Sequence, residues 1–196
     1  MNNKRKGKIF IVSGSSGSGK TTLLKRLASL KEFRGNLVKI ITATTREPRD
    51  LEKDGRDYYF LGREEFLRRL HNGEFIESQE IYSDYYATPK KDLLKVINAG
   101  RDALLCIDVQ GTLALKRLFP HDAVLIFIKV PALKSLRERL HLRSSETKES
   151  LAKRLEIAKE EIGYARYYDY IIVNDVLKGA LKKIAAVITA ERSKAK

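Results

Sequence analysis

The sequence predicts an α/β fold in which a parallel central sheet is covered by helices on both faces. Short runs rich in Val, Ile and Phe alternate along the chain with segments whose leucines recur at helical spacing. Strands separated by helices favour parallel pairing, and such sheets bind ligands at the carboxyl ends of their strands. A glycine-rich turn between the first strand and the first helix marks that edge as a binding site.

This turn follows an apolar run at residues 8–12 and matches the phosphate-binding pattern G-x-x-x-x-G-K-[ST] at every fixed position. Its residues are Gly14, Ser15, Ser16, Gly17, Ser18, Gly19, Lys20 and Thr21. Because glycines carry no Cβ, successive N–H groups can converge on phosphate oxygens at a helix N-terminus. We expect Lys20 to reach the β- and γ-phosphates of a nucleotide and Thr21 to ligate Mg²⁺. A plain flexible loop is the alternative, and the strand before it and the apolar helix after it favour phosphate binding.

The other elements follow in chain order. We expect a strand at 37–41 and then a polar segment at 42–49. Residues 56–89 differ from the rest of the chain in composition, since tyrosine-rich short strands surround a short helix. This pattern predicts a small lobe inserted in the main domain. Strands and helices then alternate again: a helix closed by Gly100, strand 103–108, helix 110–119, strand 124–130, helices 131–140 and 147–167, strand 170–173, and a helix from 177.

Composition limits the function. The 196 residues carry a net charge of +14, which suits either polyanionic small molecules such as nucleotides or nucleic acid. Lysines and arginines are spread along the whole chain without an RNA-binding aromatic motif, so we do not expect nucleic acid to be the main partner. No apolar run approaches the roughly 18 residues of a membrane span, and we expect a cytoplasmic protein. The single cysteine, Cys106, excludes an internal disulfide and is interpreted as an inert core thiol.

Several charged residues extend the phosphate site. Arg46 and Arg49 bracket a proline bend and can converge on one anion, although a solvated basic turn has the same pattern. Arg143 lies in a polar loop before the helix that carries Arg154, and such a loop can act as a lid that adds positive charge, although both arginines could equally be surface residues. Asp108 ends a strand where an acid often organises Mg²⁺, or it caps the next helix.

Taken together, the chain resembles the guanylate kinases, which move the γ-phosphoryl of ATP to GMP. The resemblance runs from residue 8 to about 190. It rests on the phosphate loop, Thr-x-Thr-Thr-Arg-x-Pro-Arg at 42–49, Gly-Arg-Asp-Tyr-Tyr-Phe at 55–60, Glu-Phe-Ile-Glu at 74–77, Tyr-Tyr at 85–86, Ile-Asp-Val-Gln-Gly at 107–111 and Lys-Arg-Leu at 153–155. It implies a P-loop three-layer fold with a core at about 7–43, 90–130 and 168–196, an inserted small mixed-β GMP-binding lobe at about 44–89, and a helical lid at about 131–167.

The resemblance also implies site residues. The ATP site would comprise residues 14–21 with Thr22 and Asn174. The GMP site would comprise Thr42, Arg46, Arg49, Tyr58, Glu77, Tyr86, Thr88 and Asp108. The catalytic residues would be Lys20, Arg46, Arg143 and Arg154. Mg²⁺ would be bound by Thr21, with Asp108 acting through a water.

The position matching Glu77 reads guanine in this family, and the chemistry agrees. A carboxylate can accept hydrogen bonds from both N1–H and the 2-amino group of guanine, whereas adenine offers neither donor, and such a mismatch discriminates by roughly 10⁴-fold. The chain departs from the family pattern at Ala87, Cys106, Leu142 and Ser144. None of these departures removes a charged catalytic group.

Three other functions share parts of this pattern. Protein-binding scaffold modules keep the fold but generally lose catalytic charges, which are all present here. A kinase for a ribose phosphate would not need Glu77 together with Thr88. A basic RNA-binding protein would show steep salt dependence of binding. We therefore expect ATP and GMP or dGMP as partners, and the sequence leaves open whether the chain is a monomer or a homo-oligomer.

Overall fold

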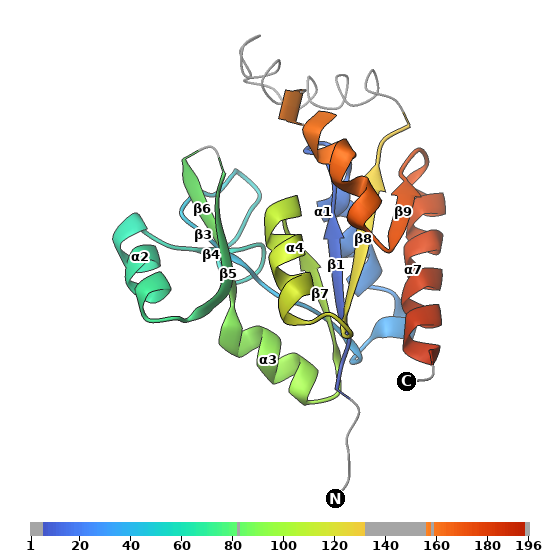
Figure 1. Cartoon of the computed structure of the whole chain (residues 1–196), viewed down its shortest axis with the longest axis horizontal. Helices are drawn as coiled ribbons and strands as arrows, with labels where there is room; N and C mark the ends of the chain where they lie inside the picture. The colour runs from blue at the N-terminus through green and yellow to red at the C-terminus, as the bar shows by residue number, and fades with distance from the viewer. Residues whose placement is uncertain (1–5, 82, 132–155, 158, 195–196) are drawn as a thin grey trace, which may run out of the picture.

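The computed structural model describes residues 6–81, 83–131, 156–157 and 159–194 (Figure 1). Its central sheet contains β1 (Ile9–Ser13), β2 (Leu37–Lys39), β7 (Asp102–Cys106), β8 (Ala123–Lys129) and β9 (Tyr170–Val173). The strand order is β2-β7-β1-β8-β9, and every pair is parallel. The predicted parallel sheet is confirmed, with β7 directly beside the strand that leads into the phosphate loop.

Helices cover both faces of this sheet and complete the three layers (Figure 1). Alternate side chains of β1 point to opposite faces, as the period of a strand requires. Phe10 and Val12 pack with α1 (Lys20–Ala28) and α7 (Leu177–Ser193), whereas Ile9 and Ile11 pack with α3 (Lys90–Asn98) and α4 (Val109–Leu118). All four side chains are fully buried. The core therefore anchors the end of β1, and the phosphate loop starts from a fixed point.

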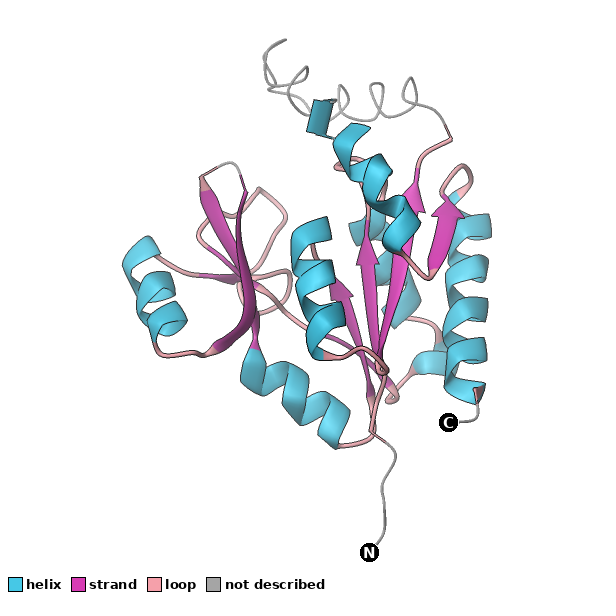
Figure 2. Cartoon of the chain, viewed as in Figure 1, coloured by secondary structure: helices cyan, strands magenta, loops and turns pink. Residues whose placement is uncertain are grey.

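A second, smaller sheet lies apart from the central one (Figure 2). It contains β3 (Ala43–Thr44), β4 (Tyr59–Phe60), β5 (Phe75–Ile81) and β6 (Asp84–Pro89) in the order β4-β3-β6-β5. It is mixed, since β3 and β4 are parallel while β6 runs antiparallel to β3 and β5. The helix α2 (Arg63–His71) covers it through Phe66, which packs against Phe75 and Tyr85. The predicted mixed sheet around a short helix is confirmed.

Some element bounds differ from the sequence prediction. The strand expected at 37–41 ends at Lys39, because the chain then leaves the central sheet and pairs as β3, inside the segment expected to be only polar loop. The strand expected at 103–108 ends at Cys106, because Asp108 caps α4 instead of extending β7. Two 3₁₀ turns also form, η1 (Lys31–Phe33) and η2 (Tyr164–Tyr167).

The predicted lid at 131–167 lies largely outside the described residues, and so do Arg143 and Arg154. Its described end, residues 156–157 and 159–163, is helical and leads into η2. The division of the chain into core, lobe and lid stays a prediction.

Candidate active site

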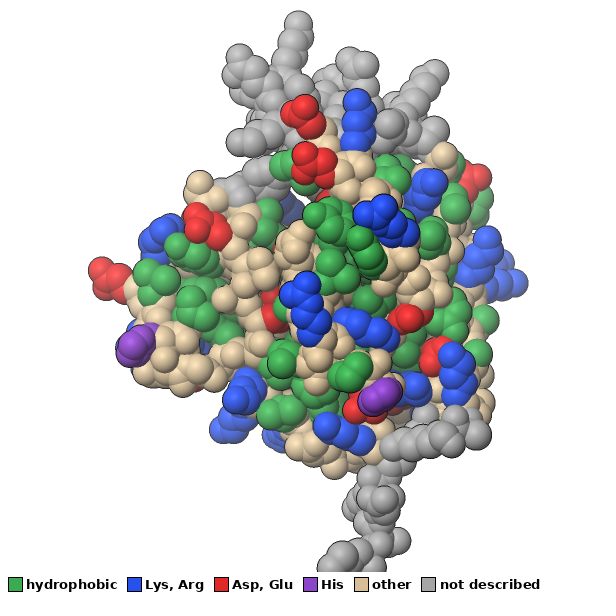
Figure 3. Space-filling model, in the orientation of Figure 1, with side chains coloured by type: hydrophobic (Ala, Val, Ile, Leu, Met, Phe, Trp, Pro, Cys, Tyr) green, Lys and Arg blue, Asp and Glu red, His purple; other side chains and the backbone are tan. Residues whose placement is uncertain are grey.

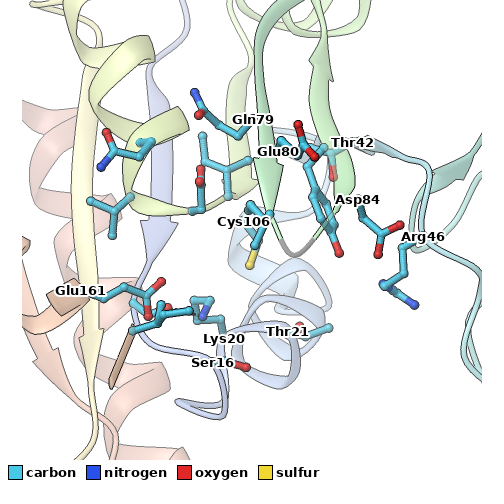
Figure 4. Close-up of a pocket in the computed structure, with 18 of the residues that line it drawn as sticks. Ser16, Lys20, Thr21, Thr42, Arg46, Gln79, Glu80, Asp84, Cys106 and Glu161 are labelled. Carbon is cyan, nitrogen blue, oxygen red and sulfur yellow. Dashed lines mark hydrogen bonds between the residues drawn. The ribbon is translucent and has the colours of Figure 1, made fainter. Parts of the chain in front are cut away.

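A cavity of about 720 Å³ opens at the carboxyl ends of β1 and β7, between the central sheet and the second sheet (Figure 4). It brings together most residues of the predicted ATP and GMP sites. Those that line it are Gly14, Ser16, Gly17, Gly19, Lys20, Thr21, Thr42, Arg46, Arg49, Tyr58, Glu77, Tyr86 and Asp108. Among the predicted site residues that the structure describes, Ser15, Ser18, Thr22, Thr88 and Asn174 do not line it.

The phosphate loop has a backbone that demands glycine. Gly14, Gly17 and Gly19 all have positive φ, at 136°, 83° and 89°. A Cβ on Gly14 would lie 2.2 Å from the carbonyl oxygen of Ile128. The following helix, α1, has neither a side-chain cap nor an acidic residue in its first turn. Its first N–H groups are therefore available to an anion, as phosphate binding requires.

Lys20 and Asn174 hold the loop from two sides. The ammonium group of Lys20 donates to the carbonyl oxygens of Gly14 and, at 3.0 Å, Ser15. The side-chain amide of the buried Asn174 donates to the carbonyl oxygen of Ser18 at 2.8 Å. A Cβ on Gly19 would lie 2.5 Å from that amide nitrogen, so Asn174 packs directly against the loop. Its predicted contact with ATP stays a prediction, as does that of the exposed Thr22.

Glu77 and Thr88 form a pair across β5 and β6, where the strand register places them opposite each other. The Thr88 hydroxyl donates to a Glu77 carboxylate oxygen at 2.5 Å. Burial, with the nearby charge of Asp108, raises the pKa of Glu77 to about 7, although the bond from Thr88 opposes this shift. A buried carboxylate of this kind favours a ligand that brings hydrogen-bond donors.

Arg46 lies on the second sheet's side of the cavity (Figure 4), and its guanidinium packs against aromatic rings. Its guanidinium is 5.6 Å from the ring centre of Tyr58, whose ring meets that of Tyr86 edge-on at 6.2 Å. Arg49 is more exposed and lines the same cavity. The two arginines thus share one cavity with two tyrosine hydroxyl groups, an arrangement suited to a phosphate.

The Asp108 carboxylate caps a helix and also borders the cavity. It accepts from the N–H of Gly111 at 2.8 Å, so it caps α4, and it also faces the cavity. Burial raises its pKa, which the Gly111 N–H and the charge of Lys20 oppose. The two sequence interpretations of this residue, cap and acid at the phosphate site, are therefore compatible.

The oxygen donors suit Mg²⁺ rather than a transition metal. Thr21 and Asp108 present a hydroxyl and a carboxylate to the same cavity. Within the described part of the chain, no three His, Cys, Asp or Glu side chains gather into a metal cluster. Mg²⁺ fits such a sparse set, because it keeps several waters and takes phosphate oxygens from its nucleotide.

The cavity also has lining residues that the sequence analysis did not assign to it, and Glu161 and Cys106 are two of them. Glu161 points at the phosphate loop beside Lys20 and Ser16 (Figure 4). Burial raises its pKa, while Lys20 opposes that shift. Nothing in the spacing of its helix set Glu161 apart. Cys106 packs against the hydrophobic core at the end of β7, as the sequence indicated, and burial raises the pKa of its thiol. Its side chain also borders the cavity, which the sequence analysis did not predict.

Comparison with known proteins decides the family. A family model described as Guanylate kinase matches residues 6–191. The chain is 41% identical over 192 residues to the guanylate kinase of Caldanaerobacter subterraneus subsp. tengcongensis, which covers 98% of this chain and 91% of that protein. The chain belongs to the guanylate kinase family. It is also 42% identical over 191 residues to the guanylate kinase of Maricaulis maris, with 97% and 86% of the two chains covered.

A solved structure agrees with this guanylate kinase assignment. The crystal structure of guanylate kinase from Anaplasma phagocytophilum matches with a TM-score of 0.83 and 35% identity, and the match covers 98% of this chain and 89% of that one. Membership in this family of kinases also makes the chain an enzyme. The basic side chains are dispersed over the visible face rather than gathered in one patch (Figure 3). None of the described helices is long and apolar enough to cross a membrane.

Proposed function

We propose that this guanylate kinase family member transfers the γ-phosphoryl group of ATP to GMP, and to dGMP, giving ADP and GDP or dGDP in the cytoplasm. The observation that carries the proposal is that one cavity contains both the phosphate loop and the Glu77 carboxylate. A triphosphate on the loop and a guanine at Glu77 would face each other across it. Family membership and the relatives named guanylate kinase support the same reaction.

Glu77 would select the acceptor. Its ionised carboxylate would accept hydrogen bonds from guanine N1–H and the 2-amino group, while Thr88 holds it in place. AMP offers neither donor, and it would leave a buried carboxylate without partners. Arg46, Arg49, Tyr58 and Tyr86 would bind the GMP phosphate, and Thr42, also on the cavity wall, completes the acceptor site.

The phosphate loop would bind the donor. Its N–H groups and the ammonium of Lys20 would contact the β- and γ-phosphates once Lys20 leaves the loop carbonyls that it now contacts. Thr21 would hold Mg²⁺ directly and Asp108 would do so through a water, and the ion would neutralise charge on the phosphates. Arg46, and on sequence grounds Arg143 and Arg154, would add positive charge around the group in transfer.

Transfer in this arrangement is direct and in line. The acceptor oxygen and the donor phosphate would lie in one cavity, so positioning and charge stabilisation would account for the rate and no covalent intermediate is required. Excluding water matters, because a poised phosphoryl group could otherwise be hydrolysed.

The test is ADP formation from Mg-ATP with GMP, dGMP, AMP, CMP and UMP offered separately. We expect turnover with GMP and dGMP, and loss of turnover in Lys20→Ala protein whose circular dichroism and unfolding match the wild type. Folded wild-type protein that turns over no acceptor would overturn the proposal and favour a binding module. Equal turnover of GMP and AMP would overturn the role of Glu77.

A further inference from the structure

Glu52 lies behind Arg46, on a turn that the sequence did not single out. One carboxylate oxygen of Glu52 accepts from the Arg46 guanidinium at 2.7 Å and from the backbone N–H of Arg49 at 3.0 Å. The N–H of Glu52 in turn donates to the Arg49 carbonyl at 2.8 Å, which closes the turn. A single carboxylate oxygen thus joins both arginines of the predicted phosphate site, one through its side chain and the other through its backbone.

The carboxylate approaches Arg46 from outside the cavity. Arg46 and Arg49 both line the cavity, whereas Glu52 is not among the described residues that do. Arg46 carries five N–H donors in a planar fork. One bonds Glu52, another bonds the carbonyl oxygen of Glu47, and the guanidinium also packs on the rings of Tyr58 and Phe60. These contacts fix the plane of the fork while leaving donors for a ligand.

The opposite charges of Arg46 and Glu52 also favour the contact between their side chains. The side chains of Arg46 and Glu52 are only 16% and 19% exposed, so screening by solvent is limited. Burial acts to raise the pKa of Glu52, but the Arg49 N–H and the Arg46 guanidinium outweigh it and leave that pKa lowered. Glu52 is therefore ionised at neutral pH, and Arg46 has an anionic partner in the unliganded protein.

We propose that Glu52 is a positioning residue for the acceptor phosphate, which holds Arg46 and the Arg49 backbone in the orientation that binds the phosphate of a nucleoside monophosphate. This inference rests on the proposed function. Glu52 acts through Arg46 and the Arg49 backbone and does not itself contact the nucleotide. It should therefore affect the phosphate end of GMP and leave the guanine end and the ATP site unchanged.

The experiment compares wild-type protein, Glu52→Gln, Glu52→Asp and the control Asp50→Asn, which removes an equal charge from an exposed position on the same turn. We expect Glu52→Gln to raise KM for GMP by about tenfold, since small misplacements of a binding group cost this much or more. KM for ATP and the inhibition constant of guanosine, which lacks the phosphate, should stay within a factor of two of wild type, by the approximate additivity of separated sites. Glu52→Asp should recover part of the affinity, and Asp50→Asn should behave as wild type.

A double-mutant cycle separates positioning from general stability. In Arg46→Gln protein, adding Glu52→Gln should change KM for GMP by a clearly smaller factor than in wild type, because only the contact with the Arg49 backbone is left to lose. An equal fold-change in both backgrounds, or equal weakening of GMP and guanosine, would overturn the inference. So would an unchanged or lowered KM for GMP in Glu52→Gln. Wild-type protein that fails to phosphorylate GMP would instead overturn the proposed function, so the two failures are distinct.

Discussion

Replacement of Glu77 by glutamine should stabilise the unliganded protein, by an amount that grows as the pH rises from about 4.5 to 7 and is then constant. Burial raises the pKa of Glu77 from 4.5 to about 7 in the folded protein. One pH unit between these values corresponds to about 1.4 kcal/mol, so the ionised side chain lowers the free energy of unfolding by about 3 kcal/mol above pH 7. Glutamine keeps an oxygen for the Thr88 hydroxyl and carries no charge to desolvate.

The sign follows from proton binding. Between about pH 4.5 and 7 the folded protein holds a proton on Glu77 that the unfolded chain releases, so this group makes stability fall as pH rises through that window. Below the window both states are protonated, and above it both are ionised. Groups with lowered pKa, such as Glu52, act in the opposite direction, but their contribution cancels when variant and wild type are compared.

Urea unfolding at pH 5, 6, 7 and 8 measures the difference directly. We expect Glu77→Gln to exceed wild type by little at pH 5 and by about 3 kcal/mol at pH 8. The matched control is Glu74→Gln, an exposed carboxylate just before β5, which should show no pH-dependent difference. A stability difference that is constant with pH, or a variant less stable than wild type at pH 8, would refute the idea that burial of the ionised Glu77 carboxylate destabilises the folded protein.

Three further variants test the donor site. Lys20→Ala should lower kcat by roughly 10²- to 10³-fold, since it removes the positive charge beside the phosphoryl group in transfer. Steady-state kinetics measure this loss. A urea titration should show the same unfolding as wild type, and lower stability would mean that the variant acts by unfolding the loop. Gly19→Ala places a Cβ 2.5 Å from the Asn174 amide at a φ of 89°, so urea unfolding should report a loss of about 1–2 kcal/mol. Its control, Gly179→Ala in α7, meets nothing within 4 Å and should gain up to about 1 kcal/mol. Glu161→Gln should tighten ATP binding by roughly fivefold in calorimetry, because it removes a carboxylate that lies beside the phosphate loop and would repel the phosphates of ATP. Glu160→Gln, which changes the neighbouring cavity-lining carboxylate, serves as its control, and equal effects of the two variants would exclude a specific contact of Glu161 with the loop.

The sequence predicted what local patterns determine. The phosphate loop is a contiguous motif, and its glycines, helix and strand identify it before any tertiary contact is known. The alternation of strands and helices predicted the parallel sheet for the same reason. Glu77 and Thr88 were joined only through the family resemblance, because their contact depends on the register of two strands.

The remaining features of the site depend on where strands and helices end and on which segments contact each other in the folded chain. Cys106 packs against the core as predicted, but its place on the cavity wall could not be predicted, because a run of apolar residues does not reveal at which residue a strand leaves the sheet. Asp108 had two interpretations. Its contact with the Gly111 N–H confirms the helix cap, and its role at the phosphate site stays a prediction. Glu52 and Glu161 sit in ordinary charged segments, and only the folded chain brings them to Arg46 and to the phosphate loop.

The most direct test of the account is the ratio of kcat/KM for GMP to that for AMP, measured in wild-type protein and in Glu77→Gln. The account predicts a wild-type ratio of at least roughly 10⁴, because AMP leaves the Glu77 carboxylate buried without partners. It predicts that the ratio in Glu77→Gln falls by a factor of roughly 10² or more, mainly through lost activity with GMP. A wild-type ratio near one, or a ratio that Glu77→Gln leaves unchanged, would contradict the assignment of guanine recognition to this carboxylate.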